Sequence, residues 1–151
     1  MIVISDWLEQ CDIEPLRWGM TEDDLIKVSC ISQKQIADLK KRKYPYIPID
    51  HVDLHFIDDL NYRGLVEIVV TIFTPDSDTE SQCFELGWLG ELRCFGEISD
   101  RLTQLNVEWV PMRNPYSKAL DIRVKGLGIL GFDPDGENDQ SAELFKIFFV
   151  E

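Results

Sequence analysis

The sequence is poor in basic side chains. Its 151 residues contain 15 Lys and Arg against 28 Asp and Glu, which gives a formal net charge of −13. Proteins bind a nucleic-acid backbone through clustered Lys and Arg, so this balance argues against a nucleic-acid partner. No apolar run reaches the length of a membrane helix, and the start MIVISDWLEQ lacks the basic region and cleavage site of a signal peptide. We therefore expect a cytoplasmic protein that does not bind membranes.

Cysteine is also scarce. The four cysteines are Cys11, Cys30, Cys83 and Cys94, and no two of them form a C-x-x-C pair. Their spacing fits no zinc ribbon, and they are too few for a disulfide framework. We expect four small buried thiols in a reducing compartment, and we predict no cofactor.

The first 46 residues carry helix signals. Thr21 and Asp24 have the spacing of a capping box, as do Ser32 and Gln35. Each pair predicts a helix that begins just after its first residue, and the second helix should end by Lys43 because Pro45 follows. Ser5 should cap a shorter helix over residues 6–10.

From residue 47 onward the apolar pattern changes to the two-residue period of strands. We expect strands at 51–57, 66–74, 107–110, 120–125, 127–132 and 142–150, the last as an inner strand. Pro111 should stop the strand at 107–110. Residues 84–86 and 92–95 should form a hairpin, and Ser99 should cap a short helix that ends near residue 106. The predicted fold is α+β, a single domain over 1–151 with helices in 1–46 packed on a mainly antiparallel, meandering sheet in 47–151.

Three motifs could carry chemistry. His51, Asp53 and His55 would share one face of a strand, where two imidazoles and a carboxylate could bind a metal, but they are strung along about 13–14 Å. We therefore favour a polar outer face. Residues 126–131, GLGILG, fit G-x-G-x-x-G, but Pro134 prevents the helix that must follow, so we expect sheet glycines. Residues 133–139, DPDGEND, place glycine wrongly for a calcium loop and predict a charged turn.

The negative charge is concentrated in the middle of the chain. Residues 47–100 hold 12 acidic and 2 basic side chains. Such a field accelerates association with a basic partner. The candidate partner-binding residues are Asp58, Asp59, Tyr62, Asp76, Asp78 and Glu80.

Two segments resemble a known family. Residues 17–26, RWGMTEDDLI, are similar to the start of many small bacterial immunity-type proteins of polymorphic toxins, in which Gly-Met-Thr or Gly-Met-Ser and acidic residues lead into the first helix. Residues 126–133, GLGILGFD, with 145–149, FKIFF, resemble the C-terminal strands of the same group. The resemblance implies a protein without catalytic activity that binds and blocks a cognate secreted toxin of the same bacterium.

The sequence thus favours a non-enzymatic immunity protein whose partner is a basic toxin domain. Two alternatives stay open. One is a metal-dependent or small-molecule enzyme that uses His51, Asp53 and His55, and the other is a structural or adaptor domain of a larger complex. A homodimer through an uncovered sheet edge is compatible with all three functions.

Overall fold

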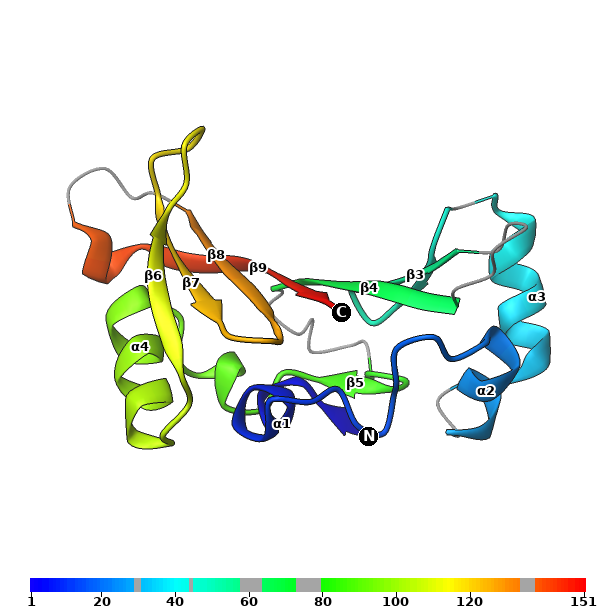
Figure 1. The fold of residues 1–151 in the computed structure, drawn as a ribbon. Coiled ribbons are helices and arrows are strands. Elements are labelled where there is room, and N and C mark those ends of the chain that lie inside the picture. Colours follow the sequence, from blue (N-terminus) through cyan, green and yellow to red (C-terminus); the bar gives the residue numbers. More distant parts are fainter. Residues whose placement is uncertain (29–30, 44, 58–63, 73–79, 134–137) are drawn as a thin grey trace.

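The centre of the fold is a seven-stranded antiparallel sheet built from two meanders that join side by side (Figure 1). The computed structural model describes residues 1–28, 31–43, 45–57, 64–72, 80–133 and 138–151. The first meander contains β2 (Ile47–Ile49), β3 (Val52–Ile57) and β4 (Gly64–Thr71). The second contains β6 (Trp109–Arg113), β7 (Leu120–Val124), β8 (Gly128–Asp133) and β9 (Glu143–Val150). Because β4 pairs with β9, the strand order is β2-β3-β4-β9-β8-β7-β6.

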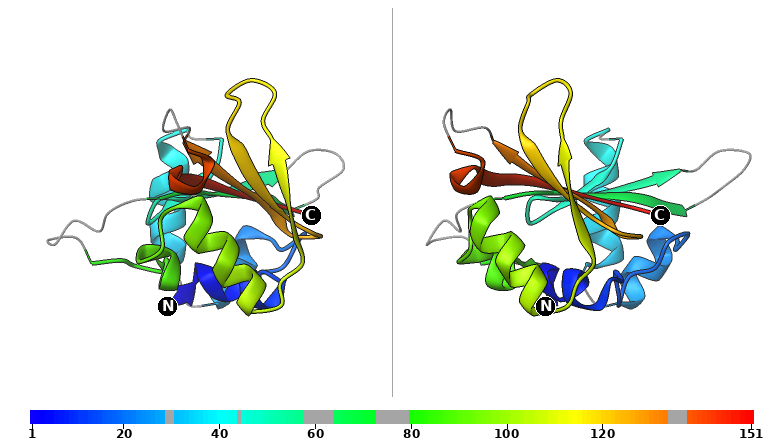
Figure 2. Two further views of the ribbon diagram at one scale, coloured as in Figure 1. Left: turned by 90° about the vertical axis from the view of Figure 1, so that its left-hand side faces the viewer. Right: turned by 60° about the vertical axis from the view of Figure 1, so that its left-hand side comes forward.

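The helices gather on one side of this sheet. They are α1 (Ile4–Gln10), α2 (Glu22–Lys27), α3 (Gln33–Lys41) and α4 (Phe95–Gln104), with short 3-10 turns η1 (Gly87–Gly90) and η2 (Asp139–Ser141). In Figures 1 and 2, α1, α2 and α4 lie below the sheet, and α3 stands beside the β2 edge. Together with the sheet, these helices confirm the predicted α+β class. No helix among the described residues is long and apolar enough to cross a membrane.

A second, two-stranded sheet lies in the helical layer. The N-terminal strand β1 (Ile2–Val3) pairs in parallel with β5 (Phe84–Glu85). Trp7 of α1 is fully buried above this pair, and its ring meets Phe84 and Phe149 edge-to-face at centroid distances of 6.1 and 5.2 Å. Its indole Nε1 donates to the carbonyl of Glu14 at 2.9 Å. Trp7 therefore connects α1 to both sheets.

Both predicted capping boxes are confirmed. Thr21 Oγ1 accepts from the amide of Asp24 at 3.0 Å, and the Asp24 carboxylate accepts from the amide of Thr21 at 3.0 Å. Ser32 and Gln35 form the same reciprocal pair at the start of α3. The hydrogen bond from the Thr21 amide is the main cause that lowers the pKa of Asp24 to about 2. The Thr21 hydroxyl, Lys27 and Arg17 also contribute to this lowering. An ionised Asp24 thus stabilises the start of α2.

Four predictions of local structure are wrong for identifiable reasons. Ser5 does not cap α1, because the helix already begins at Ile4 and Ser5 is buried inside it. Residues 84–95 form no hairpin, because β5 pairs with the N-terminal strand and residues 87–90 coil into η1. Helix α4 begins at Phe95, because Cys94 and Glu97 form a capping box ahead of Ser99. Strand β6 continues through Pro111, which an edge strand tolerates.

The β2–β3 turn is fixed by one carboxylate. Asp50 and His51 both have positive φ, at 51° and 64°, a conformation that costs roughly 1–2 kcal/mol in a non-glycine residue. The Asp50 carboxylate accepts three backbone amides, from Gln82 at 2.9 Å, Cys83 at 2.6 Å and Phe84 at 2.9 Å. The turn therefore holds the segment that enters β5 and stabilises the contact between the two sheets.

One glycine permits the close approach of α1 to η1. Gly87 has a φ of +65°, and a Cβ there would lie 2.0 Å from Ser5 Oγ. Ser5 itself is 1% exposed, so it has no room to move aside. Only glycine fits this position.

The cysteines do not behave as four buried thiols. Cys83 is buried and disulfide-bonded, so the expectation of a fully reduced set is wrong at this position. Cys11 is free and exposed, and Cys94 is free and half-buried, with its Sγ donating to Glu97 at 3.2 Å. Cys30 lies outside the described residues.

We predict that Asp50→Ala lowers the free energy of unfolding by about 2–4 kcal/mol, because three amides lose a charged acceptor. Urea denaturation followed by circular dichroism measures this loss. The control is Asp38→Ala on α3, whose exposed carboxylate pairs with Lys41 at 3.6 Å and should contribute less than about 0.5 kcal/mol. Equal effects of the two variants would contradict the role given to Asp50.

We also predict that Cys11 and Cys94 react with a thiol-alkylating reagent in the unreduced, denatured protein, whereas Cys83 reacts only after reduction. Cys11 and Cys94 are free, and Cys83 is disulfide-bonded. Mass spectrometry of the labelled peptides measures the modification of each of these three cysteines. Labelling of Cys83 before reduction would show that the disulfide does not form in the isolated protein.

Candidate partner-binding face

The sheet has one face that the helices do not cover. We call this the outer face, the side of the seven-stranded sheet opposite α1, α2 and α4 (Figure 2). Side chains alternate between the two faces of a strand, so the register identifies its members. One complete row runs across six strands as Asp53, Val69, Phe148, Ile129, Arg123 and Val110.

The middle of this row is apolar. Val69 is nearly buried by its neighbours, Phe148 and Ile129 are half-buried, and Val110 is 53% exposed. Val150 and Phe145 of β9 add two more large apolar side chains, 44% and 47% exposed. Three of the five exposed large apolar residues in the described part of the chain thus lie on these sheet strands: Val110, Phe145 and Val150.

Polar residues also lie at the β3 end of the outer face. Asp53 lies next to Val69 on β4, and His55 lies opposite Glu67. Burial raises the pKa of Asp53, while the positive potential of His55, Lys146 and His51 acts in the opposite direction. The His55 ring packs against Tyr46 at a centroid distance of 5.1 Å.

The alternative arrangement of His51, Asp53 and His55 as metal ligands is not formed. His51 belongs to the turn, with a φ of +64°, and strand β3 begins only at Val52. His51 therefore does not continue the strand face that Asp53 and His55 share. Among the described residues, no three His, Cys, Asp or Glu side chains are grouped so that they could hold a metal ion. The stacking of His55 on Tyr46 gives this histidine a structural role instead.

The other two motifs have structural roles where they are described. Gly128 and Gly131 lie within β8, as expected of sheet glycines, but Gly126 lies in the turn before β8 with a φ of 73°. In the acidic segment, Asp133 is the last residue of β8. The Asp139 carboxylate accepts two hydrogen bonds from the Arg113 guanidinium, at 3.0 and 3.1 Å. This pair lowers the pKa of Asp139. Residues 134–137 lie outside the described residues.

The structure tests little of the predicted acidic interface. Glu80 is described, and its side chain is exposed. The other five candidates lie outside the described residues: Asp58, Asp59, Tyr62, Asp76 and Asp78. The acidic interface therefore stays a prediction.

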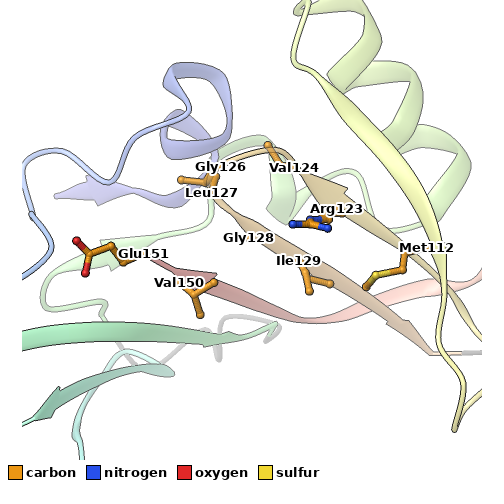
Figure 3. Close-up of a pocket in the computed structure, with 9 residues that line it drawn as sticks. All are labelled: Met112, Arg123, Val124, Gly126, Leu127, Gly128, Ile129, Val150 and Glu151. Carbon is orange, nitrogen blue, oxygen red and sulfur yellow. The ribbon is translucent and has the colours of Figure 1, made fainter.

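A shallow hollow of about 210 Å³ marks the β7–β8 end of the outer face (Figure 3). Met112 and Ile129 line it on one side, beside the guanidinium of Arg123, and Val150 and Glu151 line it on the other. The hollow is small and open, which suits one inserted side chain of a protein partner.

Each edge strand of the seven-stranded sheet contains a proline. Pro48 is the middle residue of β2, and Pro111 is the middle residue of β6. The amide of Lys125 donates to the carbonyl of Glu108, and the amide of Asn114 donates to the carbonyl of Ala119. In an antiparallel pair every second residue is hydrogen-bonded to its partner, so the bonded residues of this strand pair have even numbers on β6. Pro111 falls between them, with its nitrogen on the free edge. A homodimer through edge-to-edge pairing is thereby disfavoured.

The sequence did not reveal the apolar part of the outer face. Residues 144–150 are apolar on both faces of the strand, which is typical of a strand buried on both sides. That pattern indicated the central position of β9, which the structure confirms. It did not indicate that one of the two faces is left uncovered.

Comparison with known proteins finds no matching family model, no matching curated protein and no matching solved structure.

We predict opposite pH dependences for two carboxyl variants. The raised pKa of Asp53 means that its ionisation disfavours the folded state, so Asp53→Asn should be more stable than wild type at pH 7, and the gain should shrink as the pH falls toward 3. Asp24, with a pKa near 2, stabilises the fold when ionised, so Asp24→Asn should be less stable at pH 7, with the loss vanishing as the pH falls from 4 through 2. Thermal unfolding across pH 2–7 measures both, and the same sign for both variants would contradict the assignment.

Proposed function

We propose that this chain is a protein-binding domain without chemistry of its own, and that its partner covers the outer face. One observation carries the proposal. The helices cover one face of the central strands, and on the other face Val69, Phe148 and Ile129 adjoin one another, with Val110 beyond Arg123. Exposed apolar surfaces with a polar border are typical of protein-interaction sites.

We further propose that the partner is a basic toxin domain and that the chain is its immunity protein. The net charge of −13 and the resemblance of residues 17–26 and 126–133 to immunity-type proteins support this class of partner. The two contributions differ in range. The overall charge attracts a basic partner over a distance of about 10 Å, whereas the apolar row acts only in contact.

A cytoplasmic location belongs to the same proposal. The disulfide at Cys83 is the observation that speaks against it, because disulfides persist mainly in oxidising compartments. The labelling of Cys83 described above measures whether that bond is present.

The experiment is co-expression with the toxin domain encoded beside this gene. We expect the wild-type chain to restore growth. We expect Val110→Asp and Val150→Asp, at positions 53% and 44% exposed, to fail to do so and to bind the purified domain at least tenfold more weakly. The control Gln104→Asp adds the same charge at an exposed position of α4 and should behave as wild type.

Two results would overturn the proposal in different ways. Restored growth by all three variants would remove the outer face as the interface. Absence of a toxin domain beside the gene, or no restored growth with the wild-type chain, would overturn the immunity function and favour an adaptor domain.

A further inference from the structure

The β6–β7 hairpin rises from the sheet on the side away from α1 and α4, next to the outer face (Figures 1 and 2). Its tip carries Tyr116, whose side chain is 94% exposed. No other large apolar or aromatic side chain among the described residues is so exposed. A tyrosine in this position loses little conformational freedom on binding and offers both an apolar ring and a hydroxyl.

The tip is held in one conformation by its own backbone and side chains. Asn114 Oδ1 accepts the amides of Tyr116 at 2.9 Å and Ser117 at 3.1 Å. The amide of Lys118 donates to the carbonyl of Asn114 at 3.0 Å, and Lys118 has a φ of +64°. These bonds fix the direction in which Tyr116 leaves the hairpin. Such preorganisation reduces the entropy lost on binding.

The base of the tip is anchored to a second element. The Arg113 guanidinium binds the Asp139 carboxylate with two hydrogen bonds and the Lys118 carbonyl with a third, at 2.9 Å. Arg113 thus connects the hairpin to η2. Lys125 pairs with Glu108 at 3.3 Å, and Lys118 Nζ donates to the carbonyl of Pro115 at 3.0 Å.

Arg123 differs from the other cations of this hairpin. It is exposed, and it forms no ion pair or hydrogen bond with any residue that the structure describes. It stands within the apolar row, next to Ile129 and Val110, and lines the hollow with Met112. An arginine fork without an acceptor on an apolar surface suits a partner carboxylate, which it can bind with two parallel hydrogen bonds.

We infer that the hairpin tip and the hollow together form the specificity-determining part of the interface, and that they bind an extended segment of the partner. This inference rests on the proposed function. The segment inserts an apolar side chain between Met112, Ile129 and Val150, places an Asp or Glu on Arg123, and packs against Tyr116. The partner, although basic overall, therefore presents an acidic residue beside an apolar one at this point. The partner residue that contacts Arg123 is acidic, whereas the net charge of the partner, which attracts it to this protein, is positive.

A library of random 12-residue peptides displayed on phage tests the inference without the natural partner. We expect selection on the wild-type chain to enrich peptides with Asp or Glu next to Leu, Phe or Met. Binding of a synthetic enriched peptide, measured by calorimetry, should weaken at least tenfold in Tyr116→Ala and in Arg123→Glu. Arg123→Lys keeps the charge but not the fork and should fall between these and wild type.

The control is Lys34→Glu, the same charge reversal at an exposed position on α3, which should change affinity less than twofold. Enriched peptides that bind Tyr116→Ala and Arg123→Glu as well as wild type, but not Val150→Asp, would overturn the inference and leave the proposed function standing. Peptides insensitive to all three variants would count against both. Failure to enrich any peptide, or enrichment without acidic residues, would overturn the acidic and apolar segment proposed here.

Discussion

The pairing of β4 with β9 is the interaction on which the rest of the structure depends. Each meander is built from local hairpins, but residues 64–71 and 143–150 lie far apart in the sequence and meet only in this ladder. Their pairing aligns Ile68 with Phe149 on the inner face and Val69 with Phe148 on the outer face. Phe149 of the inner pair packs against Trp7, so α1 and the N-terminal strand are placed by the same ladder. Without it, neither the core nor the row across the outer face would be continuous.

The predictability of the fold follows the range of the interactions. The capping boxes at Thr21 and Ser32 were predictable because each involves residues three positions apart. Strand β9 was predictable as an inner strand because its apolar side chains point to both faces. The pairing of β1 with β5 was not predictable. Each strand has only two residues, which carry too little pattern, and the paired residues are about 80 positions apart in the sequence. The prediction that the strand ends at Pro111 was wrong because a proline is tolerated only in an edge strand, and the position of a strand in the sheet depends on long-range pairing.

The site was less predictable than the fold. Charge counting drew attention to the acidic middle of the chain, whereas the feature that stands out in the structure is an apolar row. No periodicity distinguishes a face covered by the protein's own helices from a face left for a partner, because both require apolar side chains. Nothing in the sequence distinguishes Arg123 from Arg113 and Lys125, because only the fold shows that the latter two form ion pairs.

The two proline-containing edges and the apolar outer face imply a division of the protein's surface. A sheet can recruit a partner through its edge or through its face, and Pro48 and Pro111 weaken the first route on both sides. Contact through the face uses side chains instead of backbone amides, and side chains carry sequence-specific shape and charge. An uncovered face between blocked edges therefore favours one particular partner over general strand addition. Under the proposed function, this arrangement would supply selectivity for one cognate protein, and the excess of negative charge would raise the rate of encounter.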